Sequence, residues 1–229
     1  MVKPSNTKSG FFLLGALLIA ATSLFIFGWL AEEILEGDTQ RFDALIRSAV
    51  HQLATPWLTL LMRGFSFLGS VPVVTAMCLA VICVFLYFRR LRNAALLAIT
   101  MFGVAALDVA LKQAFHRPRP VAFFGISPNS YSFPSGHAFG SLCFYGVLAA
   151  LLASRVRRRA AKFFLWTAAV LLTGMIGFSR IYLGVHYPSD VIAGYLAGAV
   201  WITAVLSLDK ILAGRHRKER NGPQELISK

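Results

Sequence analysis

Two stretches of this 229-residue chain gather side chains that can bind and attack an anion. One begins at residue 112 and the other at residue 179, and each combines arginine with histidine. The set consists of Lys112, Arg119, Ser135, Gly136, His137, Arg180, His186 and Asp190. Arginine presents paired donors that match phosphate oxygens, and lysine adds a mobile point charge. These residue types therefore favour binding of a phosphate group beside an imidazole that can attack phosphorus.

In the first stretch, prolines and a predicted helix N-cap leave polar groups available to a ligand. Prolines on both sides of Arg119 keep the backbone extended there, so the side chain projects instead of winding into a helix. Ser135 is placed as the N-cap of a following helix, which leaves the amides of Gly136 and His137 free. Free amides at a helix N-terminus, next to a residue without a side chain, form a cradle for an anion.

The second stretch predicts a nucleophile and its orienting group. Pro188 is typical of the first residue of a helix. His186 then lies just before this helix and Asp190 in its first turn, where the carboxylate can reach an imidazole N–H. Such a carboxylate fixes the tautomer and leaves the other ring nitrogen available to attack.

Taken singly, each of these residues also has a structural interpretation. A histidine at a helix end is often a hydrogen-bonded structural group, and an arginine can extend to lipid headgroups. Asp108 lies four residues before Lys112, so a helical ion pair is its expected role. Neither His116 nor Arg117 has a partner that the sequence identifies. Two histidines and one aspartate could also hold a metal, but three neighbouring cations disfavour a divalent ion, and we predict none.

The elements that must position these residues are membrane helices. Apolar residues of the AVILMFWYC set make up 57% of the chain, charged residues only 14%, and the mean hydropathy is +0.65. Soluble domains contain about 25% charged residues, so this composition indicates a membrane protein. The net charge of +13 comes from short basic clusters between apolar runs, which is typical of cytoplasmic loops and argues against a nucleic-acid partner.

Six apolar stretches are long enough to cross a membrane, which needs about 20 helical residues. Their approximate ranges are 11–30, 71–88, 93–111, 136–153, 163–178 and 189–208. We therefore predict an all-α fold, a bundle of six transmembrane helices that forms a single domain over residues 1–229. Two pairs, Gly136 with Gly140 and Gly194 with Gly198, are spaced for close helix packing, although glycines at the second pair can also provide general helix flexibility. The two motif-bearing stretches can meet only if the helices that flank them are bundled.

The charges also predict an orientation. With the N-terminus inside, the inner segments hold 16 of the 23 Lys and Arg residues, six of them in the basic tail 209–229. The positive-inside rule then places both termini in the cytoplasm and the two motif stretches on the extracytoplasmic side. The longest outer segment, residues 31–70, carries apolar residues at helical spacing between positions 42 and 53, before Pro56 ends the pattern. We expect a short amphipathic helix there, acting either as a lipid entrance or as structural packing.

Together the motifs resemble a known family. The patterns are Lys112-x6-Arg119-Pro120, Pro134-Ser135-Gly136-His137 and Ser179-Arg180-x5-His186-x3-Asp190. They are similar, in order and in every signature residue, to those of the type 2 phosphatidic acid phosphatase superfamily. Within it the chain looks like a bacterial membrane member of the phosphatidylglycerophosphatase B group. The motifs span residues 112–190, whereas the first helices and the tail resemble the family only in hydropathy.

The resemblance implies a role for each residue. His186 would attack phosphorus to form a phosphohistidine, Asp190 would orient its ring, and His137 would protonate the leaving oxygen and later activate water. The phosphate oxygens would be held by Lys112, Arg119, Ser135, Gly136 and Arg180. The family resemblance implies neither a metal nor a cofactor.

These observations predict a membrane lipid phosphate phosphatase that needs no metal and acts on the extracytoplasmic face. Its substrate would be phosphatidylglycerophosphate, undecaprenyl pyrophosphate or a related lipid, since phosphatidic acid and diacylglycerol pyrophosphate present the same terminal phosphate. A lipid or anion transporter with a non-reactive cationic site is the alternative, and release of inorganic phosphate distinguishes the two. Vanadate-dependent haloperoxidases share the phosphate-site pattern, but those enzymes are soluble. The sequence indicates no oligomeric state.

Overall fold

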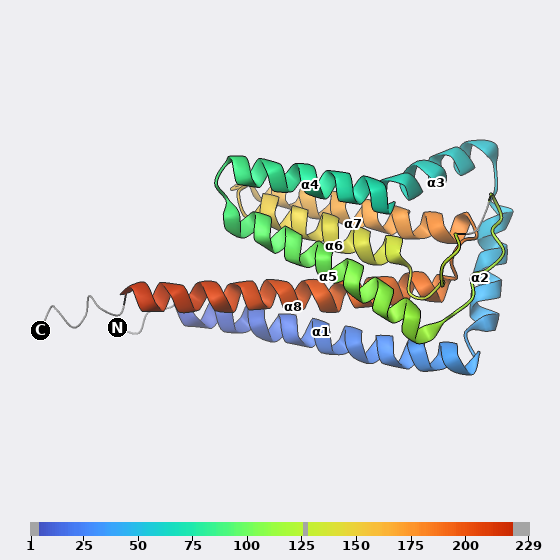
Figure 1. Cartoon of the computed structure of the whole chain (residues 1–229), viewed down its shortest axis with the longest axis horizontal. Coiled ribbons are helices and arrows are strands. Elements are labelled where there is room, and N and C mark those ends of the chain that lie inside the picture. Colours follow the sequence, from blue (N-terminus) through green and yellow to red (C-terminus); the bar gives the residue numbers. More distant parts are fainter. Residues whose placement is uncertain (1–4, 126–127, 222–229) are drawn as a thin grey trace, which may run out of the picture.

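The computed structural model describes residues 5–125 and 128–221, and the regular secondary structure in those ranges is entirely helical (Figure 1). This confirms the predicted all-α class. The helices are α1 (Ser5–Glu36), α2 (Gln40–Gln52), α3 (Pro56–Leu68), α4 (Val71–Tyr87), α5 (Leu91–Phe115), α6 (Gly136–Ala153), α7 (Arg159–Tyr182) and α8 (Pro188–Asn221).

The long helices run side by side, and α2 crosses one end of the bundle (Figure 1). The central element is α6, because it packs against α4, α5, α7 and α8, while α1 packs along α8. Consistent with this position, the α6 side chains of Phe139, Phe144 and Val147 are fully buried. The described beginning of α1 and the described end of α8 lie at the end of the bundle opposite α2.

Within the described ranges, five helical segments are each long and apolar enough to cross a membrane, judged by length and composition. They are Leu13–Glu36, Leu91–Phe115, Gly136–Ala153, Arg159–Tyr182 and Pro188–Ala213. A sixth span exists only if α3 and α4, which meet at a bend of 48°, are counted as one. The chain is thus a multi-pass membrane protein with five or six candidate spans, and the predicted count of six depends on this bent pair.

The predicted apolar stretches correspond to helices, some of which are longer or shorter than the stretch. The stretch 136–153 coincides with α6, and the stretch 163–178 lies within the longer helix α7, which begins at Arg159 and ends at Tyr182. The stretch 71–88 is the exception, because α4 has only 17 residues, fewer than the roughly 20 that a bilayer core requires. The missing length is available in α3, which the sequence placed in the outer segment.

The outer segment 31–70 contains the last turns of α1 and the helices α2 and α3. Thr55 caps α3, since its hydroxyl accepts a hydrogen bond at 3.3 Å from the amide three residues later. The face of α2 that packs against the bundle carries Asp43 and Val50, both buried, whereas Leu45 is 59% exposed. Thus α2 packs through a charged group, and its place in the membrane interface stays a prediction.

A close approach of α8 to α6 joins two of the motifs. A Cβ atom added at Gly194 would lie 2.6 Å from the Ser135 carbonyl oxygen, so only glycine fits there. A Cβ atom at Gly198, one turn further along, would lie 2.9 Å from the Leu142 side chain. The predicted close packing is thus confirmed at Gly194 and Gly198, whereas a Cβ atom at Gly140 would lie 3.9 Å from Val104, an ordinary contact. The close approach at Gly194 lets the Ser135 amide donate to the Asp190 carbonyl at 2.9 Å, which fixes the start of α6 against the start of α8.

The orientation across the membrane and the single-domain assignment stay predictions. The basic tail 209–229 begins inside α8, which continues to Asn221. Lys3 and the end of that tail, residues 222–229, lie outside the described residues.

Candidate active site

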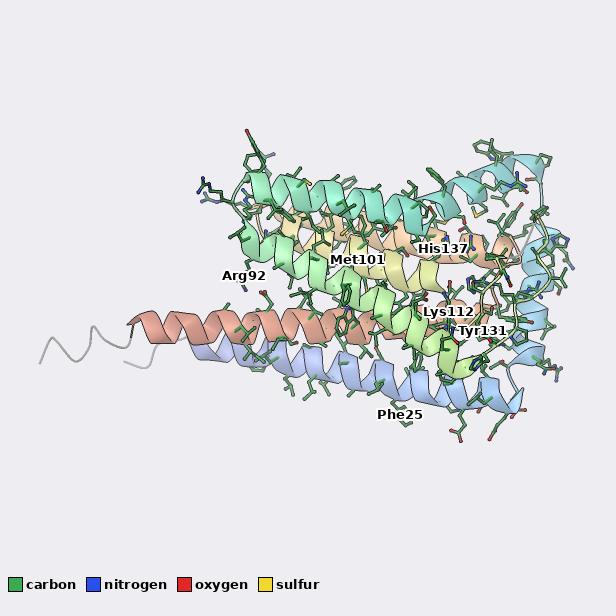
Figure 2. All side chains as sticks on the ribbon, in the orientation of Figure 1. Phe25, Arg92, Met101, Lys112, Tyr131 and His137 are labelled. Atoms are coloured by element: carbon green, nitrogen blue, oxygen red, sulfur yellow. The ribbon has the colours of Figure 1, made fainter. Side chains whose placement is uncertain are left out.

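The residues of the three motifs lie at the end of the bundle that α2 covers. Lys112 is in the last turn of α5 and His137 is the second residue of α6. Figure 2 shows both at this end, together with Tyr131 of the connecting loop. Arg180 is in the last turn of α7, and His186 just precedes α8. Four helix ends and two loops therefore meet at one place.

The His186 ring is buried, with 1% of the residue exposed, and both of its nitrogens have neighbours. A guanidinium nitrogen of Arg119 lies 3.0 Å from Nε2, and an oxygen of Asp190 lies 3.4 Å from Nδ1. Because arginine only donates hydrogen bonds, Nε2 accepts and carries a lone pair, and the proton is assigned to Nδ1, facing the carboxylate. One ring nitrogen is thus held by Asp190 and the other has the lone pair of a nucleophile.

Burial keeps this imidazole neutral. Removal from water lowers the pKa of His186 from its usual 6.5 to about 4, and the charges of Arg119 and Arg180 act in the same direction. Contact with Asp190 raises the pKa without offsetting the effect of burial. His186 is therefore unprotonated at neutral pH, which is the form that a nucleophile requires.

The Asp190 carboxylate is fully buried and both of its oxygens accept hydrogen bonds. Oδ2 accepts from the Ser132 hydroxyl at 2.5 Å and from the Tyr187 amide at 2.9 Å. Oδ1 accepts from Arg117 at 2.6 Å. These contacts fix the plane of the carboxylate, and through it the orientation of the His186 ring.

A second buried carboxylate extends this network. Asp43 on α2 is 1% exposed and accepts a hydrogen bond from Arg117 at 2.8 Å. It also accepts from the amide and the hydroxyl of Ser189, at 3.0 and 2.6 Å. Arg117 thus bridges two carboxylates whose burial without a cation would be costly. The bridge fastens α2 to the residues that surround the nucleophile.

Sequence reasoning missed Arg117, Asp43 and Ser132. Arg117 had no identified partner because Asp43 lies 74 positions away in the chain and Asp190 lies 73. A signal existed, since an acidic residue on an amphipathic helix and an arginine between two motif cations each need a counter-charge when buried. Ser132 gave no comparable signal, because its contact with Asp190 depends on the path of the loop before α6.

The predicted histidines and cations form one cluster. His137 interacts electrostatically with His186, Arg119, Arg180 and Lys112, which come from four different parts of the chain. Within the described residues, no group of three or more His, Cys, Asp or Glu side chains is arranged to hold a metal. The charge gathered around the two imidazoles is therefore positive, as a site for an anion requires.

Two buried donor groups in this cluster have no partner among the described residues. They are the Ser135 hydroxyl and the Nε atom of Arg180. Ser135 is the N-cap residue of α6, as predicted, but its hydroxyl accepts no hydrogen bond from the helix. The first amides of α6 also have no acceptor within the helix. Since an unpaired buried donor costs free energy, these groups are placed to bond a ligand.

A polar cavity opens beside the cluster. Lys112 lies 2.6 Å from Asp108, which confirms the predicted helical ion pair. With Arg119 and Tyr131, this pair lines a cavity of about 710 Å³. A Cβ atom at Gly136 would lie 2.8 Å from the Asp108 carboxylate, so the start of α6 packs directly against one of the residues that line the cavity. The cavity therefore lies next to the predicted cradle.

The bend between α3 and α4 closes the cluster from the side. Arg180 donates a hydrogen bond to the Ser66 hydroxyl on α3. A Cβ atom at Gly69, the C-cap residue of α3, would lie 3.3 Å from the His137 ring. The broken span thus contacts one phosphate-binding candidate and one catalytic candidate.

Fold and cluster together define a class: a multi-pass membrane protein with a cationic site around a neutral, buried histidine. Residues 93–211 match the PAP2 superfamily, so the chain belongs to that superfamily. The resemblance that the three motifs predicted is thereby confirmed.

Known relatives extend the likeness beyond the motif region. Phosphatidylglycerophosphatase B of Bacillus subtilis is 31% identical over 191 residues, which cover 82% of this chain and 94% of the relative. The crystal structure of the transmembrane PAP2-type phosphatidylglycerolphosphate phosphatase of the same species has a TM-score of 0.78 at 26% identity, and the match covers 83% of this chain and 96% of that one. The undecaprenyl-diphosphatase of Sulfolobus acidocaldarius is 31% identical over 125 residues, or 52% of this chain and 56% of the relative.

Proposed function

We propose that this chain is a membrane phosphatase that removes the terminal phosphate of a lipid through a phosphohistidine at His186, without a metal ion. One observation carries the proposal. The unpaired donors of Ser135 and Arg180 lie in the same cluster as the lone pair of a neutral His186. Donors without partners beside a nucleophile suit the oxygens and the centre of a phosphoryl group.

In the first step, His186 Nε2 forms a bond to phosphorus while the bond from phosphorus to the lipid oxygen breaks. Arg119 moves its donor from Nε2 to a phosphate oxygen, which frees the lone pair. His137 gives a proton to the leaving lipid oxygen, and it can hold that proton once the anionic phosphate offsets the positive charges of Arg119, Arg180 and Lys112 around it. Asp190 holds the ring in line and stabilises the positive charge that it gains.

In the second step, water attacks the phosphohistidine. His137, now neutral, takes a proton from the water while the phosphorus–nitrogen bond breaks. Inorganic phosphate leaves and His186 returns to its neutral form. Lys112, Arg119 and Arg180 stabilise the charge on the phosphate oxygens in both steps.

The proposed substrates are lipids with a terminal phosphate. A phosphatidylglycerophosphatase and an undecaprenyl-diphosphatase are among the relatives, and we extend both substrates to this chain as candidates. The excess of basic residues on the opposite side of the bundle supports a reaction on the extracytoplasmic face.

Phosphate release from these lipids in detergent tests the proposal. The purified protein should release inorganic phosphate with or without EDTA, and His186→Ala should release none. His51→Ala, which changes an exposed histidine on α2, is the matched control and should keep the activity. A wild-type protein that binds these lipids without releasing phosphate would instead have the transporter-like site, and full activity in His186→Ala would exclude the mechanism.

The intermediate gives a second readout. A phosphorus-labelled lipid should leave a label on the wild-type protein that is labile in acid and stable in base, as expected for a phosphorus–nitrogen bond. No such label should form in His186→Ala. A label of the opposite stability would indicate an ester on another side chain.

A further inference from the structure

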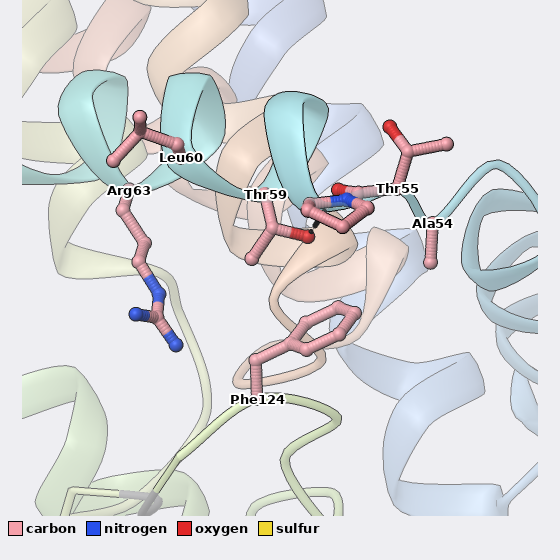
Figure 3. A pocket seen from close by; sticks show the side chains of 7 residues that line it. Ala54, Thr55, Thr59, Leu60, Arg63 and Phe124 are labelled. Carbon is pink, nitrogen blue, oxygen red and sulfur yellow. Dashed lines mark hydrogen bonds between the residues drawn. The ribbon is translucent and has the colours of Figure 1, made fainter.

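A second cavity lies between α3 and the segment that follows Arg119. Its volume is about 490 Å³, and its lining includes Thr55, Thr59, Leu60, Arg63 and Phe124. Figure 3 shows the Arg63 side chain leaving α3 on the side that faces the segment of Phe124. The mechanism proposed above uses none of these residues.

The walls of this cavity are tied together by hydrogen bonds and ring contacts. The hydroxyls of Thr59 and Tyr182 lie 2.9 Å apart, and the Thr55 amide donates to the same tyrosine oxygen at 3.3 Å. The Phe124 ring stacks on the Tyr182 ring at 5.7 Å between centroids and an angle of 17°. Because Tyr182 is fully buried, α3 and the loop are fixed against α7, and the cavity is built into the fold.

The same walls adjoin the phosphate-binding cluster. Ser66 on α3 accepts a hydrogen bond from Arg180, and Arg63 precedes Ser66 by three residues. Residues three apart on a helix lie on neighbouring faces, about 5–6 Å apart between Cβ atoms. Tyr182 follows Arg180 by two residues on α7. Arg63 therefore leaves α3 about one helical turn before Ser66, the residue through which α3 contacts the cluster.

Arg63 has no compensating charge. It is exposed, and among the described residues it has neither an ion pair nor a hydrogen bond. By contrast, the buried Arg117 is shared by two carboxylates and Lys112 pairs with Asp108. A guanidinium that no acidic side chain neutralises can offer its paired donors to an anionic oxygen of a ligand.

We propose that the Arg63 cavity binds a second phosphate group of the lipid substrate, one joined to the cleaved phosphate through a short carbon bridge. This inference rests on the proposed function and names the substrate class of the same site. Two oxygens and three carbons join the two phosphorus atoms when a phosphodiester is followed by a terminal phosphate on a glycerol, and such a linker can bridge positions about one helical turn apart, which is the spacing of Arg63 and Ser66 on α3. Phosphatidylglycerophosphate has this arrangement, and phosphatidic acid lacks the second phosphate.

The experiment compares kcat/KM for these two lipids in mixed micelles at equal mole fraction. Arg63→Gln should lower kcat/KM for phosphatidylglycerophosphate about tenfold, the size expected for one charged hydrogen bond, and change the value for phosphatidic acid less than about twofold. Arg63→Lys should lose less, because it keeps the charge but not the paired donors. Arg41→Gln on α2, another exposed arginine, is the matched control and should change neither value.

Retained activity on phosphatidic acid shows that the variant is folded. An equal loss on both lipids, or no loss on either, would overturn the second phosphate site while leaving the phosphatase proposal intact. A wild-type protein that releases phosphate from neither lipid would overturn the second phosphate site, and one that also releases none from undecaprenyl pyrophosphate would overturn both proposals.

Discussion

The two sides of the candidate active site differ in how far their buried polar groups are paired within the chain. On the side of the nucleophile, buried charges are paired within the chain, and on the side of the phosphate, two buried donors, the Ser135 hydroxyl and Nε of Arg180, have no partner among the described residues. The nucleophile side consists of Asp43, Arg117, Ser132, His186 and Asp190. The phosphate side consists of Lys112, Arg119, Ser135, Gly136 and Arg180.

This difference separates orientation from binding. The paired side holds the imidazole in one position whether or not a substrate is present, because its contacts come from α2, α8 and the loops between the helices. The unpaired side gains its missing hydrogen bonds only when an anion arrives. Substitutions on the first side should therefore reduce both stability and activity, and removal of an unpaired donor on the second side should reduce activity alone.

The largest expected effect follows from removing Arg117. Arg117→Leu leaves Asp43 and Asp190 buried without their shared cation. Breaking a buried ion pair in this way costs about 3–5 kcal/mol, and the freed Asp190 no longer orients His186. We expect a lower midpoint of thermal unfolding in detergent together with a loss of phosphate release.

Arg119→Leu, two residues along the chain, is the matched control for that prediction. Its hydrogen bonds go to the carbonyl oxygens of Ser130 and Val185, to the Ser130 hydroxyl and to Nε2 of His186, so no carboxylate loses a hydrogen-bonded cation. It should reduce phosphate release with a smaller change in unfolding. If both variants unfold at the same temperature, the distinction between the two sides is wrong.

Ser135→Ala should produce an intermediate effect, confined to activity. The hydroxyl has no partner within the described chain, so its removal leaves no other group unpaired. A donor that stabilises transition-state charge is worth about a hundredfold in rate. We expect kcat to fall by about that factor in the phosphate release assay while the unfolding midpoint stays the same. A destabilised variant would place Ser135 on the paired side.

The smallest expected effect is that of pH on the nucleophile. The pKa of His186 is lowered to about 4, so its neutral form prevails and its ionisation should change kcat/KM less than about twofold from pH 7 to about pH 5. The decline due to this residue should appear only near pH 4. Asp190→Asn removes a contact that raises the pKa of His186, so the weak activity left in this variant should decline at a lower pH.

The wild-type protein and Asp190→Asn are measured on the same lipid, so the ionisation of the lipid phosphate affects both pH profiles equally. A decline centred near 6.5 in the wild-type protein would show that His186 is in contact with water. That result would contradict the conclusion that burial keeps His186 neutral.

Features set by neighbouring residues could be predicted from the sequence. Ser135 was expected as an N-cap, Pro188 as the first residue of a helix, and Asp108 as the partner of Lys112, and all three are present. Each depends on chemistry within about one helical turn, which the sequence displays directly. The remaining candidate site residues were predicted from the resemblance of the three motifs, in their order along the chain, to the superfamily.

Features that depend on packing between distant elements could not be predicted. The contact between Asp43 and Arg117 requires α2 to lie across the bundle end, and apolar periodicity did not reveal which face of α2 would pack. The bend at Gly69 could not be predicted either, because the sequence placed the residues of α3 in the outer segment and those of α4 in a separate, short span. Only tertiary structure shows that both reach the motif residues.

The docking of α2 has a practical consequence for anyone who wishes to shorten this protein. The region that matches the superfamily begins at residue 93, whereas Asp43 lies 50 positions upstream of it. A version trimmed to residues 93–211 would retain every motif residue. Without Asp43, however, Arg117 would lose one of its two counter-ions and the Ser189 amide would lose its hydrogen-bond acceptor. The smallest autonomous catalyst must therefore include α2, even though none of the three motifs lies there.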